Sequence, residues 1–86
     1  MSADQQEKEL REAMAASRAE YASLSQEYDR LLDQAHAFEH GSPEVVKILI
    51  AANALGRQMA DALRHHHNSV EQLTAFYLSR QTTGHK

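Results

Sequence analysis

Apolar residues recur through the first half of the chain at alternating spacings of three and four. Neither Pro nor Gly interrupts positions 3–40. The row consists of Leu10, Met14, Tyr21, Leu24, Tyr28, Leu31, Ala35 and Phe38, with gaps at Glu7 and Ser17. This heptad spacing is typical of helices packed side by side. It predicts a helix over about residues 3–40, opened by a capping box in which Ser2 is the cap and Gln5 reaches back.

The second half carries three apolar rows instead of one, and they predict a helix over about residues 43–81. Two of the rows are Val45, Ala52, Met59, His66, Leu73 and Ile48, Leu55, Ala62, Ser69, Phe76, and the third is Leu49, Gly56, Leu63, Val70, Tyr77. A helix pair needs only two rows, so the third is expected to contact a further neighbour. Residues 81–86 are weak helix formers and are expected to fray.

A sharp turn is predicted where the two helical patterns meet, at His40-Gly41-Ser42-Pro43-Glu44. Glycine adopts the left-handed conformation that ends helices. Ser42 is a favourable N-cap, and Pro43 fits the first helical position, where no amide donor is needed. The expected fold is therefore all-α, a long antiparallel helical hairpin forming a single domain over residues 1–86.

The two arms have matching lengths, which predicts the residues that face each other. Counting outward from the turn, opposed residues have numbers that sum to about 83. Tyr28 then meets Leu55 and Gly56, and the polar interruptions Ser17 and His66 coincide. Residues 1–40 carry nine acidic and four basic residues (−5), whereas residues 43–86 carry three and five (+2), so charge also favours antiparallel pairing.

Composition restricts the function classes. A net charge of −3 argues against a nucleic-acid-binding protein. The longest apolar run, Val45 to Leu55, is too short for a membrane span, and no signal peptide is evident, so a cytoplasmic protein is expected. No Gly-rich phosphate loop, HExxH motif or activated nucleophile is present. We expect no enzymatic activity and no cofactor.

Six histidines raise the possibility of metal binding. His36 and His40 are four apart, close enough on a helix to share an ion. The favoured interpretation is that both stabilise the negative end of the first helix, so no metal site is predicted and these two residues are only minor candidates. The run His65-His66-His67 points three ways around a helix and cannot converge on one ion. A pH-sensitive interface remains an alternative.

A hairpin one layer thick leaves the third row of the second helix in water. Since burying apolar area is favourable by about 25 cal/mol per Å², this surface should recruit a protein partner or a second copy, giving a coiled coil or four-helix bundle. The predicted partner-binding residues are Ile48, Leu49, Leu55, Met59, Leu63, Val70, Phe76 and Tyr77. The main hypothesis is a protein-interaction module, the alternative is a homodimeric four-helix-bundle structural or regulatory protein, and a His-based metal or pH sensor comes third.

The long first helix, the short turn and the Ala/Leu/Ile-rich second helix containing His67-Asn68-Ser69-Val70 resemble the small type III secretion co-chaperones. These proteins hold the needle subunit together with a helical-repeat partner before export. The resemblance implies a helical hairpin that binds a helical protein. Two other hairpin families fit less well. The chain lacks the Trp-x-Gly turn of secreted WXG-type hairpins, and it has one proline, Pro43, where needle subunits usually carry two in the turn.

Overall fold

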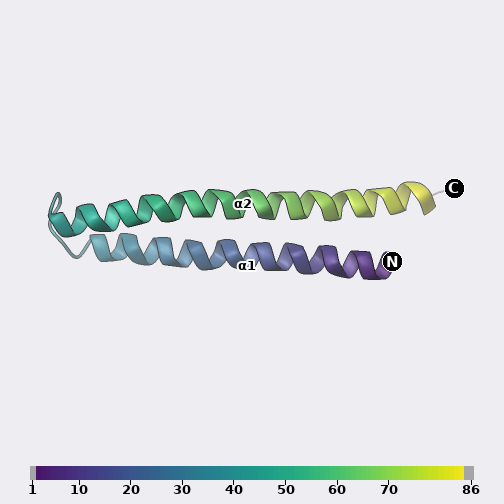
Figure 1. The fold of residues 1–86 in the computed structure, drawn as a ribbon, viewed down its shortest axis with the longest axis horizontal. Helices are drawn as coiled ribbons and strands as arrows, with labels where there is room; N and C mark the ends of the chain where they lie inside the picture. Colours follow the sequence, from purple (N-terminus) through teal and green to yellow (C-terminus); the bar gives the residue numbers. More distant parts are fainter. Residues whose placement is uncertain (1, 85–86) are drawn as a thin grey trace.

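The computed structural model describes residues 2–84 and shows a hairpin of two helices, α1 (Ala3–Ala35) and α2 (Pro43–Gly84). The helices run side by side in opposite directions, so that Ala3 and Gly84 lie at the same end (Figure 1). The molecule measures 66 × 17 × 15 Å. Its radius of gyration is 19.3 Å, whereas a compact domain of this length has about 12 Å. The predicted all-α hairpin is confirmed.

Ser2 caps α1, but only half of the predicted capping box forms. The Ser2 hydroxyl accepts a hydrogen bond from the Gln5 amide at 3.1 Å, and the Ser2 carbonyl accepts one from Gln6 at 3.0 Å. The side-chain amide of Gln5 does not reach back, because it donates to the Glu9 carboxylate one turn further on, at 3.1 Å. The Gln5–Glu9 bond satisfies a pair of exposed side chains and leaves the cap to Ser2 alone.

The first helix ends at Ala35, so the predicted end near His40 is wrong by five residues. The amides of Ala37 and Phe38 bond to carbonyls three residues back, at 3.1 and 3.3 Å, which tightens and terminates the last turn. Packed helices lie about 8–10 Å apart. Had α1 continued to His40, only two residues would remain to cross that distance and reverse the chain. Residues 36–42 form the connection instead.

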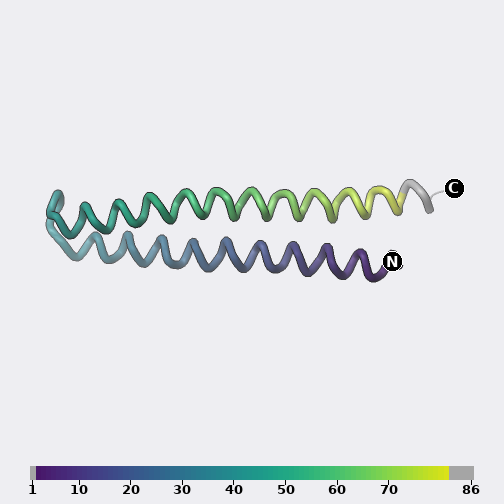
Figure 2. The backbone as a smooth tube through the Cα atoms, viewed as in Figure 1, coloured from purple at the N-terminus to yellow at the C-terminus, as the bar shows by residue number. Residues whose placement is uncertain are grey.

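The start of α2 agrees with the sequence prediction. Gly41 has φ of +78°, the left-handed conformation, inside a turn closed by the Ser42 amide donating to the Glu39 carbonyl at 3.2 Å. The Ser42 hydroxyl accepts from the Val45 amide at 3.3 Å, and α2 begins at Pro43. At its other end α2 continues to Gly84, and residues 85–86 lie outside the described chain. The expected fraying of residues 81–86 stays a prediction. The backbone trace shows α2 running as one helix beside α1 (Figure 2). No helix breaker precedes Gly84, and adding a residue to an existing helix is far easier than starting one.

The hairpin has a thin core. Among the described side chains, the buried apolar ones are Val45, Ala52, Ala62 and Leu73, all on α2, and Ser17 is the buried polar one on α1. The chain exposes 6602 Å², whereas a compact protein of its mass exposes about 5,100 Å². Two helices alone therefore leave a large apolar surface in water.

Candidate interaction surface

Direct contacts between the two helices confirm the predicted alignment. Ser17 Oγ lies 3.0 Å from His66 Nδ1, and these residue numbers sum to 83. A Cβ atom built on Gly56 would lie 3.9 Å from Tyr28 Cε2, which sums to 84. A third contact, between Glu7 and Tyr77, also sums to 84. The alignment matters for function because it determines which rows of α2 are covered by α1 and which are left open.

The Ser17–His66 pair forms a satisfied polar layer inside the hairpin. Ser17 donates its hydroxyl hydrogen to the Met14 carbonyl at 2.9 Å. A hydroxyl has one hydrogen, so the bond to His66 must be donated by Nδ1–H of the imidazole. Both the neutral Nδ1–H tautomer and the protonated ring can make this donation. The neighbouring His65 and His67 are exposed, as the sequence predicted.

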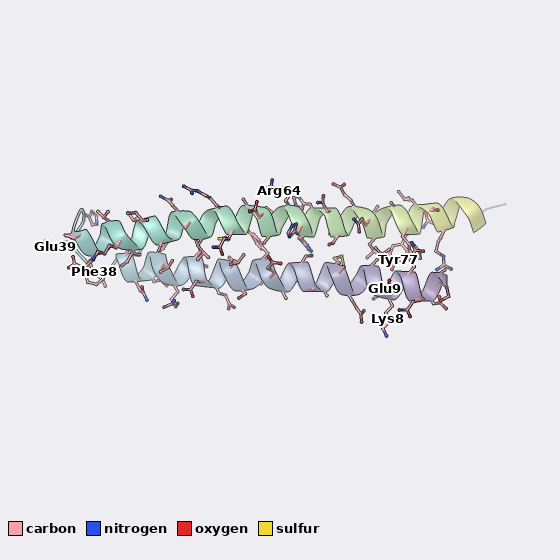
Figure 3. The ribbon with its side chains drawn as sticks, in the orientation of Figure 1. Lys8, Glu9, Phe38, Glu39, Arg64 and Tyr77 are labelled. Carbon is pink, nitrogen blue, oxygen red and sulfur yellow. The ribbon has the colours of Figure 1, made fainter. Side chains whose placement is uncertain are left out.

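A second polar cluster ties the open end of the hairpin. The Tyr77 hydroxyl donates to Glu7 Oε2 at 2.6 Å, and Tyr77 lies between the two helices (Figure 3). Arg11 and Arg80 approach the same carboxylate at 3.7 and 3.8 Å. The Arg80 guanidinium also lies 5.6 Å from the Phe76 ring centroid. The hydrogen bond to Glu7 is the main cause that raises the pKa of Tyr77 above its ordinary value of 10.0.

The structure divides the eight sequence-predicted partner-binding residues into two groups. The half-buried group on the inner side of α2 consists of Ile48, Leu55, Met59 and Phe76. The exposed group consists of Leu49, Leu63, Val70 and Tyr77. All four exposed residues belong to the third row identified in the sequence, and each is between 37% and 44% exposed. Leu49, Leu63 and Val70 are open to another molecule, whereas Tyr77 is in part engaged by Glu7 and the first four are largely used within the hairpin.

Further apolar residues on the surface were absent from the predicted set. They are Phe38, Val46, Ile50 and Leu78, exposed by 44%, 47%, 63% and 57%. Phe38 lies in the connection beyond the end of α1 at Ala35, not in the helical seam where the sequence placed it. Val46 and Ile50 are apolar and lie outside the two inner rows, so the sequence already indicated that they would be exposed. Leu78 belongs to none of the three apolar rows, and nothing in the sequence around it indicated that it would be exposed.

The surface beside the turn contains a shallow apolar hollow of about 500 Å³. It is lined by Gln34, Ala37, Phe38, Glu44, Lys47 and Ile48. Phe38 and Ile48 supply large apolar side chains, while Glu44 and Lys47 bring opposite charges to its edge. The hollow is thus formed by residues of α1, the connection and α2.

The structure does not place His36 and His40 as a helical pair. Because α1 ends at Ala35, His36 is the C-cap residue and His40 lies in the turn, so the spacing of four no longer puts them on one helical face. The same shortening removes His40 from the last turn of the helix, where it was expected to offset the helix dipole. Across residues 2–84, no group of three or more His, Cys, Asp or Glu side chains is positioned to hold a metal ion.

Neither α1 nor α2, over the residues described, has a stretch long and apolar enough to cross a bilayer. No protein-family model, curated protein or solved structure matches this chain. The molecule is a narrow two-helix hairpin with an exposed apolar row along α2.

Proposed function

We propose that this protein is a non-enzymatic protein-interaction module that binds an α-helical partner along the exposed row of α2. The observation that carries the proposal is the row itself. Leu49, Leu63, Val70 and Tyr77 are spaced by multiples of seven on a straight helix and all remain more than a third exposed. Helical partners recognise such spacing by laying their own apolar stripe along it.

The hairpin is suited to this role because its internal contacts hold the row in place. The Ser17–His66 and Glu7–Tyr77 bonds fix how the helices align, so α1 leaves the same side of α2 open. In the finer version of the proposal, the protein is a small cytoplasmic co-chaperone that shields an aggregation-prone helix, in keeping with the resemblance to type III secretion co-chaperones. The length, the single short turn and the Ala-rich second helix support that version.

Affinity purification from the source cells with two matched variants tests the proposal. Leu63→Glu/Val70→Glu places two charges in the exposed row, whereas Gln58→Glu/Gln72→Glu places two charges on exposed positions of α2 outside that row. A partner bound through the row is lost with the first variant and kept with the second. Circular dichroism shows that both variants remain helical. Equal partner recovery with both variants contradicts the proposal.

A further inference from the structure

An uncharged seam runs along α2 and includes the exposed row described above. We define the outer seam as the positions reached from Val46 to Gln81 in alternating steps of three and four, beginning 46, 49, 53, 56. Its spacing is that of a heptad seam. Two of its members, Gly56 and Tyr77, also border α1. None of its positions is Asp, Glu, Lys or Arg. A long helix whose seam contains no Asp, Glu, Lys or Arg has a surface suited to contact another helix.

Gly56 lies in the outer seam, and the hairpin itself does not require a glycine there. A Cβ at this position would lie 3.9 Å from Tyr28 Cε2, an ordinary van der Waals distance. Glycine in a helix interior costs about 1 kcal/mol relative to alanine. The missing Cβ of Gly56 faces Tyr28 of α1, so Gly56 lies at the border between the outer seam and the hairpin interface.

A flanking strip next to the outer seam indicates which helix packs on that seam. Each strip residue lies four positions beyond a seam residue, and the strip consists of Ile50, Arg57, Arg64, Glu71 and Leu78. Outward from Arg64, the two halves complement each other: Arg57 mirrors Glu71, and Ile50 mirrors Leu78. Ile50 and Leu78 are the most exposed large apolar side chains described, at 63% and 57%. Such a strip is self-complementary only for an antiparallel neighbour, as a two-fold axis requires.

The charged residues of the strip remain available for such contacts. Among the described residues, neither Arg57 nor Glu71 has an ion-pair partner within the chain. Arg64 points away from α1, on the outer side of α2 (Figure 3), and is held by Asp61 at 2.6 Å. The Asp61 carboxylate offsets the positive charge where two Arg64 side chains would approach each other.

We propose that the outer seam binds a second copy of this chain, with the two α2 helices antiparallel and the two-fold axis near Arg64. Arg57 of each chain then faces Glu71 of the other, and Ile50 faces Leu78. This inference rests on the proposed function, since it names the partner that the exposed row accepts. Five large apolar side chains of the seam and the strip are between 38% and 63% exposed and would be covered in such a pair: Val46, Leu49, Ile50, Val70 and Leu78.

Charge exchange tests the pairing. Arg57→Glu places a carboxylate opposite Glu71 twice per dimer, and Glu71→Arg places a guanidinium opposite Arg57 twice. Each variant alone should therefore dimerise about tenfold more weakly than the parent. An equimolar mixture of the two variants restores attractive pairs. Sedimentation equilibrium should then show a heterodimer of near-parental affinity in the mixture, at low ionic strength.

Cysteine cross-linking tests the direction and the centre. The chain has no cysteine, so single substitutions report unambiguously. Arg64→Cys should form a disulfide dimer by itself, while Ile50→Cys and Leu78→Cys should cross-link only when mixed. A parallel pair would instead cross-link each of these variants alone. Gln58→Cys, near the same level but on the other side of α2, is the matched control and should remain reduced.

Two results would overturn the inference: a monomer at every concentration, or cross-linking of Gln58→Cys as readily as of Arg64→Cys. Neither result decides the proposed function, because the paired glutamate variants test whether the row binds any helical partner, a second copy or another protein. A dimer whose affinity is changed neither by the charge exchange nor by Leu63→Glu/Val70→Glu would contradict both the dimer pairing and the binding role of the exposed row.

Discussion

The Ser17 hydroxyl and the His66 imidazole, 49 residues apart in the sequence, meet at 3.0 Å in the middle of the hairpin. Ser17 is the buried polar residue of α1, with 7% of its surface exposed. Both of its hydrogen-bonding roles are filled, because it donates to the Met14 carbonyl and accepts from His66. A polar layer of this kind stabilises one alignment of two helices over the others.

Removing one partner of this layer should cost more than removing both. We expect Ser17→Ala to lower the free energy of unfolding by about 1 kcal/mol, because Nδ1–H of the half-buried His66 loses its acceptor. In Ser17→Ala/His66→Leu, most of this loss should be recovered, since no polar group is then left unpaired. Urea denaturation measures both variants. Ser23→Ala, on the exposed side of α1, is the control and should change stability little.

The two glycines should respond to alanine with opposite signs. Gly41→Ala forces a Cβ into a backbone with φ of +78° and should destabilise the hairpin by about 1 kcal/mol. Gly56→Ala adds helix propensity and meets Tyr28 at an ordinary distance, so it should stabilise the folded chain by up to about 1 kcal/mol. Thermal unfolding of both variants at one protein concentration provides the comparison. The same sign for both would contradict the left-handed requirement at Gly41.

The two serine caps should differ in importance. Ser42 caps α2 at the half-buried turn, where its hydroxyl accepts from the Val45 amide. Ser42→Ala should therefore cost about 1 kcal/mol of global stability. Ser2 caps an exposed helix end, so Ser2→Ala should increase hydrogen exchange in the first turn of α1 and leave global unfolding almost unchanged. Equal losses of global stability would show that the first turn of α1 unfolds together with the rest.

Alkaline pH should weaken the open end of the hairpin through Tyr77. Its pKa is raised by the hydrogen bond to Glu7, by burial and by the negative charge of the carboxylate. A raised folded-state pKa means that the stabilisation is fully present below the unfolded value of about 10 and is lost as pH rises through the raised pKa. The stability difference between the parent and Tyr77→Phe should be constant up to about pH 9 and should disappear at higher pH. A pH-independent difference would exclude the hydrogen bond as its source.

Heptad spacing was sufficient to predict the hairpin, its turn and its alignment, because both arms carry their own seams and the two polar interruptions coincide. It failed at Ala35, since Phe38 continues the apolar row and nothing local between His36 and His40 forbids a helix. The end of α1 is marked by the Ala37 and Phe38 amides, which bond to carbonyls three residues back, a change that apolar spacing does not encode. The Glu7–Tyr77 bond was also missed, although these positions sum to 84 and a polar gap facing a tyrosine was a usable signal.

The exposed surface was harder to predict. The row to which a residue belongs indicates the side of the helix on which it lies, but not how much of its side chain stays exposed. Leu49 and Ile48 are adjacent in the sequence and both apolar, yet Leu49 remains 44% exposed while Ile48 is half-buried beside the turn. Their separation depends on where α1 lies around α2. That position is known only once both helices are placed.

The two cross-helix polar bonds also make sliding between the arms costly. A shift of one heptad would bring Ser17 opposite Met59 or Leu73, and His66 opposite Leu10 or Leu24, where neither finds a partner. The side of α2 that α1 leaves open is therefore constant along the hairpin. Any molecule that docks along α2 must fit that side, because α1 cannot slide to uncover another.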